Sequence, residues 1–345
     1  MIQVENITKR YGNFTAVDGI SFDIDEGEIV GFLGPNGAGK STTMNMITGF
    51  IEPSDGRIIV DGYDISKKPQ KAKRQIGYMP EGVPLYSDLT VKEFVAYMAD
   101  LKGCEKKTKK EEIKKVLEET GLTEVQNKLT KNLSRGYKQR VSMAGALVGN
   151  PKVIILDEPT VGLDPKQVTE IRTLIKNLGK KHTVILSSHI LSEISQICEK
   201  VIIINKGKIV AIDTPENLEN KVAQNNVVYV TVEDPGNKMD SIKEKLNNIK
   251  DIQFVVENED KTKKYIIKGE RDIDLRKEIF ETLSKEGITI FEMKKADATL
   301  EDAFMKLIND STNSNNTTEE NDQENQNDDK DEKEISEKEN KKEDK

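Results

Sequence analysis

A glycine-rich segment near the N-terminus carries the clearest chemistry in the chain. Residues 34–42 read Gly-Pro-Asn-Gly-Ala-Gly-Lys-Ser-Thr. This spacing matches the phosphate-binding loop G-x-x-x-x-G-K-[ST], in which backbone N–H groups cradle phosphates and glycines let the backbone approach them closely. We expect Lys40 to reach the β- and γ-phosphates of a nucleotide, and the Ser41 hydroxyl to ligate Mg²⁺.

An apolar run that ends in two acids is the second candidate. Residues 153–158 read Val-Ile-Ile-Leu-Asp-Glu. A strand beside a phosphate loop typically delivers an aspartate to the Mg²⁺ shell, a role that fits Asp157. Glu158 would face the γ-phosphate and orient the attacking water as a general base, which is typically worth about 10²–10⁴ in rate. An ordinary turn after a strand is the alternative, and the presence of the phosphate loop argues against it.

Two further polar segments have less specific signals. His189 follows an apolar run at 183–186 and could hydrogen-bond a γ-phosphate, although a histidine with only local bonds is the alternative. The other histidine, His182, is most simply a surface loop residue. Residues 133–140, Leu-Ser-Arg-Gly-Tyr-Lys-Gln-Arg, precede a predicted helix. Ser134, the Gly136 N–H and the helix dipole form a second anion site, which need not reach this chain's own phosphate loop.

Short apolar runs predict the elements that hold these residues. Residues 28–33 form a strand before the loop and residues 41–49 a helix after it, the setting that a phosphate loop requires. Further buried strands are predicted at 153–156, 183–186 and 201–204, with helices between them. These elements predict a doubly wound α/β core.

Two additions to this core are expected. Runs at 2–7, 20–24 and 57–60, separated by glycine turns, predict an antiparallel β subdomain. The segment from about 87 to 149 is mostly helical in pattern and predicts a helical subdomain. The first domain is therefore expected to span residues 1–220.

The remainder of the chain predicts a small domain and a tail. Residues 226–308 follow the order β-α-β-β-α-β of a ferredoxin-like fold and contain no histidine or cysteine. They predict either a binding or regulatory module or a stabilising appendage. Residues 311–345 hold 13 acidic residues and 6 lysines, and their composition predicts a disordered acidic tail.

Composition narrows the function. The chain has 53 basic and 61 acidic residues and a net charge of −8, nearly all of it in the tail, so the nearly neutral body argues against a nucleic-acid partner. Cys104 and Cys198 form no zinc or disulfide pattern, as expected in a reducing cytosol. There is no apolar run of 18 residues and no signal peptide at the N-terminus, so any membrane-spanning part is expected in another chain.

Together, these motifs resemble the ATP-binding subunit of ATP-binding cassette (ABC) transporters. The resemblance covers the loop 34–42, the signature 133–140, the strand 153–158, the turn 162–164 and His189, in the family's order and spacing. It implies an ABC-cassette ATPase fold that binds ATP and Mg²⁺. It assigns catalytic roles to Glu158, His189 and Lys40, and metal binding to Ser41, Asp157 and Glu81. The implied nucleotide contacts are Tyr11 (stacked on adenine), Val17, Gly34, Pro35, Asn36, Gly37, Ala38, Gly39, Lys40, Ser41, Thr42, Glu81, Ser134, Gly136 and Asp164.

Two positions depart from the family pattern. The family signature reads Leu-Ser-Gly-Gly-Gln, whereas here Arg135 replaces the first glycine and Tyr137 the glutamine. Glu81 stands where the family usually has glutamine; an ionised glutamate accepts hydrogen bonds but cannot donate them, and it adds negative charge near the phosphates. Both variants resemble the branch that works with ABC-2-type permeases, as does the C-terminal unit ending in Ala-Thr-Leu-Glu-Asp-Ala-Phe at 298–304.

The resemblance also implies an assembly. Two ATP-binding subunits, identical or paralogous, would meet head to tail with ATP between the loop of one and the signature of the other, and Asp164 would link the two sites. A separately encoded permease would dock near residues 85–97, hold the protein at the inner face of the cell membrane in the cytoplasm, and export a substrate. A soluble ABC-type ATPase acting on DNA or the ribosome, and a nucleotide-gated module that barely hydrolyses ATP, are the alternatives.

Overall fold

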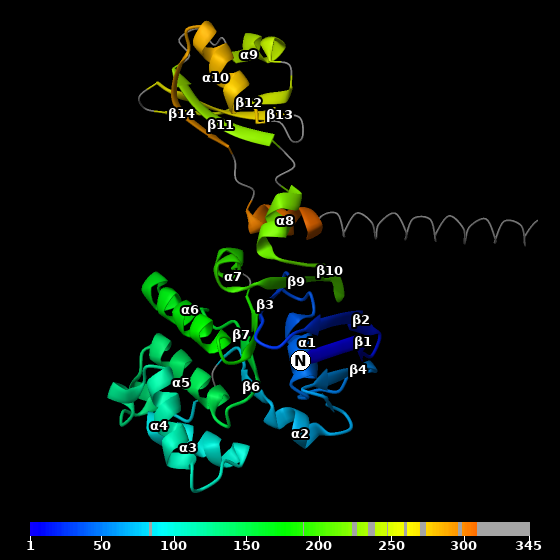
Figure 1. The fold of residues 1–345 in the computed structure, drawn as a ribbon, viewed down its shortest axis with the longest axis vertical. Helices are drawn as coiled ribbons and strands as arrows, with labels where there is room; N and C mark the ends of the chain where they lie inside the picture. Colours follow the sequence, from blue (N-terminus) through cyan, green and yellow to red (C-terminus); the bar gives the residue numbers. More distant parts are fainter. Residues whose placement is uncertain are drawn as a thin grey trace, which may run out of the picture. The chain divides into compact units, whose positions relative to one another are not determined.

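The chain forms two compact units in a computed structural model (Figure 1); the first is Met1–Pro215 together with the described residues from Phe304 on, and the second is Glu216–Ala303. The structure describes residues 1–82, 85–188, 190–222, 226–233, 239–246, 248–258, 261–269, 274–295 and 299–308. His189 and the expected acidic tail at 311–345 lie outside these residues. Within the described residues, none of the helices is long and apolar enough to cross a membrane.

A mainly parallel sheet forms the centre of the first unit. Its strands follow the order β10-β9-β3-β8-β7-β6, parallel from β9 to β6, with β10 antiparallel at the edge. Every residue of β3, β7 and β8 is buried, as expected for parallel strands covered on both faces. The strands are β3 (Ile29–Leu33), β6 (Ile76–Met79), β7 (Val153–Asp157), β8 (Thr183–Ser187), β9 (Lys200–Asn205) and β10 (Lys208–Asp213).

An antiparallel sheet forms a second layer of this unit, as the sequence predicted. Its order is β2-β1-β4-β5, and Tyr11 pairs with Phe14 where the β1–β2 hairpin turns. The alternation of buried and exposed residues along β2 shows that this sheet is covered on one face only. Its strands are β1 (Ile2–Tyr11), β2 (Phe14–Ile24), β4 (Asp55–Val60) and β5 (Tyr63–Asp64).

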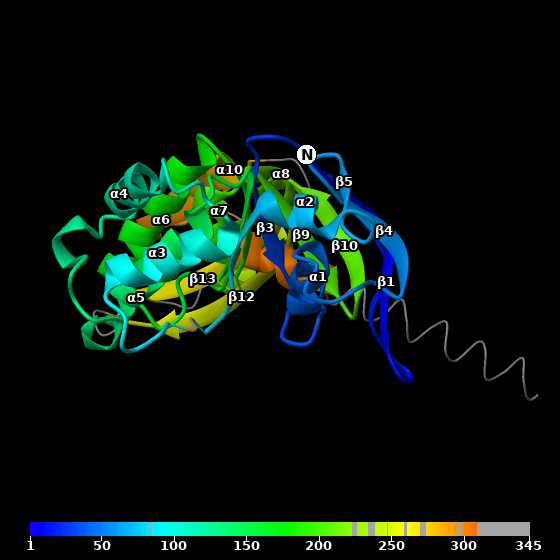
Figure 2. The ribbon, with the colours of Figure 1, turned by 90° about the horizontal axis from the view of Figure 1, so that it is seen from below.

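Helices cover the central sheet on both faces. Figures 1 and 2 place α3 to α6 on one side of it, and α1 and the antiparallel sheet on the other. A capping box between Thr90 and Glu93 starts α3, the first helix of the expected helical subdomain. The helices are α1 (Lys40–Ile47), α2 (Pro69–Arg74), α3 (Val91–Lys102), α4 (Lys109–Glu119), α5 (Arg135–Leu147), α6 (Pro165–Gly179), α7 (Leu191–Ile197) and α8 (Pro215–Val222), with 3₁₀ turns at Thr123–Val125 and Thr130–Asn132.

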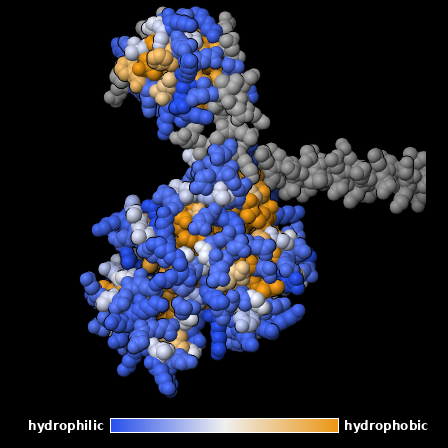
Figure 3. Space-filling model, viewed as in Figure 1, coloured by the Kyte–Doolittle hydropathy of each residue, from blue (hydrophilic) through white to orange (hydrophobic). Residues whose placement is uncertain are grey.

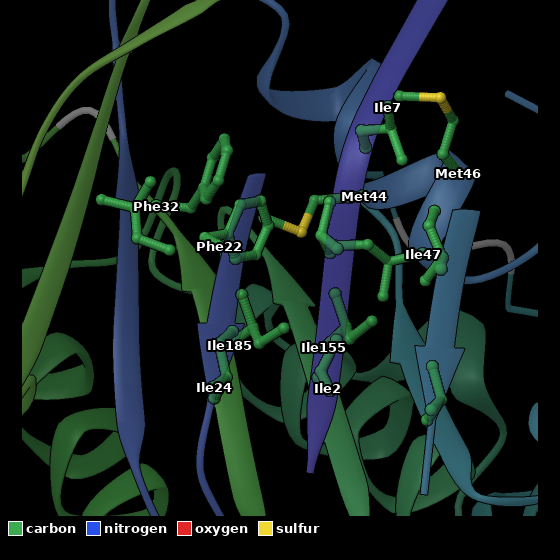
Figure 4. Packing of buried hydrophobic residues seen from close by; sticks show 14 of the residues in the cluster. Ile2, Ile7, Phe22, Ile24, Phe32, Met44, Met46, Ile47, Ile155 and Ile185 are labelled. Carbon is green, nitrogen blue, oxygen red and sulfur yellow. The ribbon is translucent and has the colours of Figure 1, made fainter. Parts of the chain in front are cut away.

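The hydrophobic core lies where α1 is packed between the two sheets. Figure 4 shows Phe22 of β2, Met44 of α1 and Ile155 of β7 in one cluster, and all three are at most 5% exposed. This packing fixes the helix that follows the phosphate loop against the strand that carries Asp157.

The second unit contains a four-stranded antiparallel sheet. Its antiparallel sheet runs β12-β13-β11-β14, which is the ferredoxin-like arrangement. On the face shown in Figure 3, hydrophilic residues cover most of the surface of each unit. The elements are β11 (Asn226–Glu233), α9 (Met239–Ile242), a 3₁₀ turn (Lys243–Lys245), β12 (Ile249–Glu257), β13 (Lys263–Gly269), α10 (Arg276–Lys285), β14 (Thr289–Lys295) and the start of a helix at 300–308.

Candidate active site

The glycine-rich loop connects β3 to α1, as its motif requires. Gly39 has φ of +109°, and a methyl group on Gly34 would come within 2.4 Å of the Ile204 carbonyl oxygen, so both positions need glycine. Lys40 is only 8% exposed. Its Nζ donates to the carbonyl oxygens of Gly34 at 2.7 Å and Pro35 at 3.2 Å. The ammonium group is thus held inside the loop, where phosphates are expected.

Two acidic residues stand at the end of β7, supported by the neighbouring strand β8. Ser187 Oγ donates to Asp157 Oδ1 and accepts from the Glu158 N–H at 3.1 Å. Asp157 and Glu158 are 4% and 9% exposed, and Ser187 has no exposed surface. Glu158 has φ of +49°, a left-handed conformation that side-chain-bearing residues rarely adopt and that tends to mark functional sites. Ser187, which motif reasoning had not singled out, therefore holds the Asp157 carboxylate and the backbone of Glu158.

A cavity of ≈ 430 Å³ joins the loop to these acids. The structure brings together ten of the predicted site residues there and adds Phe14, Ala16 and Val161. The predicted residues that line the cavity are Tyr11, Asn36, Gly37, Gly39, Lys40, Ser41, Thr42, Glu81, Asp157 and Glu158. Gly34, Pro35 and Ala38 do not line it; they form the base of the loop, where the Ala38 N–H donates to the Pro35 carbonyl oxygen at 3.1 Å.

Burial and the charges of the carboxylates both act on the titratable groups of the cavity. Burial lowers the pKa of Lys40, and the charges of Glu158, Asp157 and Glu81 act against that shift. Burial, together with the charges of Asp157 and Glu81, raises the pKa of Tyr78 to about 12. The Glu81 carboxylate is therefore close enough to influence the centre of the site.

The base-binding end of the cavity differs in part from the prediction. Tyr11 and Phe14 face each other across the hairpin, are 49% and 63% exposed, and both line the cavity. Val17 is fully buried in the core, and its neighbour Ala16 lines the cavity instead; the contact of Val17 with the nucleotide stays a prediction. The turn Gly12-Asn13 was the signal that could have placed Phe14 opposite Tyr11.

The signature segment lies at a separate pocket of ≈ 290 Å³, lined in part by Ser134, Gly136 and Asp164. Ser134 caps α5 by accepting from the Tyr137 N–H at 3.4 Å, and Asp164 caps α6 by accepting from the Gln167 N–H at 2.9 Å. A methyl group on Gly136 would come within 2.8 Å of Gln167 Oε1, which explains the glycine there. Two helix N-termini therefore meet at this pocket.

The prediction for His182 is wrong. This residue is 5% exposed, not on the surface, and its Nδ1 lies 2.7 Å from the Pro151 carbonyl oxygen. Burial lowers the pKa of His182. The flanking lysines misled the sequence interpretation, because the segment enters the buried strand β8 directly after them.

The fold and site define a P-loop nucleotide-hydrolysing domain, and comparison with known proteins identifies its family. The ABC transporter family model matches residues 17–161. The bacitracin transport ATP-binding protein BcrA of Bacillus licheniformis is 35% identical over 90% of this chain and 98% of that protein. The linearmycin resistance ATP-binding protein LnrL of Bacillus subtilis is 40% identical over 67% of this chain and 75% of that protein. The chain belongs to the ATP-binding subunits of ABC transporters, and it is an ATPase.

Solved structures agree with this assignment. The cbiO1 protein of Clostridium perfringens, part of the ABC transporter complex cbiONQ, is 33% identical with a TM-score of 0.59, covering 64% of this chain and 92% of that one. The dimeric cassette MJ0796, in a post-hydrolysis state bound to ADP and Pi, is 28% identical with a TM-score of 0.56, covering 62% of this chain and 98% of that one. Subunits of this family dimerise and work with a membrane permease.

Proposed function

We propose that two copies of this chain pair head to tail around ATP and power export through a separately encoded ABC-2-type permease at the cytoplasmic face of the membrane. The observation that carries the proposal is the separation of the two anion-binding pockets. The cavity at Lys40 and the pocket at Ser134 share no lining residue. A second copy is the simplest source of Ser134 and Gly136 for a nucleotide held by the loop.

The residues of the cavity have defined roles in this proposal. Lys40 binds the β- and γ-phosphates, Tyr11 and Phe14 stack on the base, and Glu158 orients the attacking water. His189 would contact the γ-phosphate. Asp164, at the second pocket, would link the two sites of the pair.

The cavity also fits Mg²⁺. Asp157, Ser41 and Glu81 offer oxygen ligands, which this cation prefers. In the described part of the chain, three or more Asp, Glu, His or Cys side chains do not come together in any group that could hold a metal ion. Mg²⁺ would therefore be shared with the phosphates, whose charge it neutralises, as is usual in nucleotide sites. Ser187, by holding Asp157, would keep one ligand in place.

The test of this proposal is the variant Glu158→Gln. It should bind ATP, lose turnover and accumulate as a dimer with ATP, because the amide keeps the shape of the carboxylate but is a poor base. Sedimentation velocity with ATP or ADP measures the dimer. Lys40→Ala is the control that should lose nucleotide binding. Rapid hydrolysis by Glu158→Gln would exclude the base role, and a monomer saturated with ATP would exclude the pairing.

The permease would dock at the aromatic start of the helical subdomain. Tyr86 and Tyr97 are 54% and 39% exposed, and their rings meet edge to face at 5.3 Å. Tyr86 of this pair lies a few residues after Glu81 in the chain, so movement at the phosphates could reach it. A photo-crosslinker at Tyr86 or Lys92 should capture a polytopic membrane protein.

A matched position makes this docking test specific. Ile212, on the edge strand β10, is 41% exposed and should capture no permease when it carries the same crosslinker. Equal capture from Ile212 and Tyr86, or none from Tyr86, would contradict the docking site.

We assign the second unit to an accessory role, either binding or regulatory.

A further inference from the structure

The two departures from the family pattern place opposite charges in the two halves of the proposed ATP site. Glu81 lines the phosphate cavity together with Asp157 and Glu158. Among the described residues that line this cavity, Lys40 is the sole cation. The lining therefore holds three carboxylates against one ammonium before a polyanionic nucleotide enters. With the family's glutamine at this position, the lining would carry two carboxylates instead of three.

The Glu81 charge acts at the centre of the cavity. It is among the charges that oppose the lowering of the Lys40 pKa, and it contributes to raising the pKa of Tyr78. Glu81 itself is solvent-exposed at the end of the segment that follows β6. Its carboxylate thus faces both solvent and the phosphate-binding loop, where a closing partner subunit would approach.

Arg135 is the second departure; it does not line the Ser134 pocket, whose charged lining residues are Arg140, Asp164, Lys166 and Glu170. It is the first residue of α5, directly after the cap Ser134, and the first turn of this helix holds no acidic residue. The Arg135 side chain lies over Gly162, where an added methyl group would come within 3.0 Å of its Nη1. Arg140, further along α5, pairs with Glu170 at 2.6 Å. No carboxylate of the described residues forms such a pair with Arg135.

We propose that Arg135 of one subunit supplies the positive charge that Glu81 of the other subunit makes necessary in the shared ATP site. This inference rests on the head-to-tail pairing proposed above, which brings the start of α5 to the partner's γ-phosphate. A guanidinium group matches phosphate oxygens with two parallel hydrogen bonds, and its charge is permanent. It binds the phosphate from the side opposite Lys40.

The two substitutions are therefore expected to depend on each other. The family's glutamine and glycine are both uncharged. The charges of Glu81 and Arg135 cancel, so this pair leaves the net charge of the site the same as the family's pair does. Either charge alone changes the total by one unit. Close to a phosphate in a partly dehydrated interface, one unit is worth on the order of tenfold in binding.

A double-mutant cycle tests this dependence. Wild type, Glu81→Gln, Arg135→Gly and the double variant are titrated with adenylyl imidodiphosphate and Mg²⁺, and dimer formation is followed by sedimentation velocity. Arg135→Gly should raise the analogue concentration for half-maximal dimer in both backgrounds, because the guanidinium contacts the phosphate in each, but the rise should be about tenfold larger when Glu81 is present than when residue 81 is glutamine. The dependence should shrink at high salt, because ions screen it.

Two further variants separate charge from shape. Arg135→Lys keeps the charge without the planar fork and should lose only a few-fold in affinity. Lys138→Gln removes another positive charge from the first turn of α5 and should cost clearly less affinity than Arg135→Gly. If Lys138→Gln and Arg135→Gly weakened dimer formation equally, the effect would come from the overall positive charge of the helix and not from Arg135, and the proposal would be overturned.

The cycle also distinguishes this inference from the proposed pairing. If wild type dimerises with the analogue and the two single effects simply add, Arg135 does not compensate for Glu81 and the inference is wrong. If wild type binds the analogue through Lys40 but never dimerises, the pairing itself is wrong, and the inference falls with it.

Discussion

The buried Ser187 hydroxyl allows a quantitative test of how the site is held. Ser187→Ala removes the donor to Asp157 Oδ1 and one acceptor of the Glu158 N–H, at a position with no exposed surface. The Glu158 N–H keeps the Ser187 carbonyl oxygen at 3.2 Å, so the main loss is the bond to the buried carboxylate. Losing a hydrogen bond to a buried charge costs about 2–3 kcal/mol of the free energy of unfolding. In a unit of this size, that corresponds to a fall in Tm of roughly 4–12 °C.

The same substitution should slow the chemistry. The Asp157 carboxylate and the backbone of Glu158 would lose the hydroxyl that holds them, and removing such supporting partners typically costs about 10–100-fold in activity or metal affinity. The assay is kcat for ATP hydrolysis at saturating ATP and Mg²⁺, alongside urea unfolding of the same samples.

A control at another buried hydroxyl separates the two effects. Thr120 is fully buried, and its Oγ1 donates to the Val116 carbonyl oxygen at 2.7 Å, at the end of α4 and away from the cavity. Thr120→Val should cost about 1 kcal/mol and leave kcat unchanged. If Ser187→Ala lost stability but kept the wild-type kcat, Ser187 would be structural only and the reasoning would be refuted.

Two more predictions concern glycine and histidine. Gly39→Ala would place a methyl group 2.7 Å from the Ala16 carbonyl oxygen and should weaken ATP binding more than tenfold, by about 2 kcal/mol or more. Gly37→Ala also has positive φ but meets no atom within 4 Å, so nucleotide titrations should show a clearly smaller loss; equal losses would contradict the steric argument. For His182, burial lowers the pKa in the folded state, so the unfolded imidazole takes up a proton first as the pH falls below about 6.5. Urea unfolding should therefore show stability decreasing from pH 7 toward pH 5, and His182→Gln should remove that part of the slope; an unchanged slope would contradict it.

Sequence reasoning succeeded where the motif itself determines the geometry. The spacing from Gly34 to Ser41 allows few backbone paths between a strand and a helix, and an acid after β7 must lie at the same sheet edge as the loop after β3. Parallel strands present their carboxyl ends together.

The failures arose where contacts depend on register or on distant segments. Phe14 reaches the cavity only because the hairpin turns between it and Tyr11. Ser187 lies beside Asp157 through strand pairing between segments 30 residues apart, which no local pattern reports. The strand that follows His182 carries it to Pro151 and away from solvent.

One contact of α5 has a consequence for how the ATP sites would work together. Gln139, in the second turn of this helix, donates from Nε2 to the Pro159 carbonyl oxygen at 2.8 Å, immediately after Glu158. In the proposed pair, the first turn of α5 binds the partner's nucleotide, while the second turn holds the chain's own hydrolytic residue. A shift of the helix on loss of one γ-phosphate is thereby passed to the opposite reaction centre. Such a pair should hydrolyse ATP cooperatively, with the two sites acting as one coupled unit.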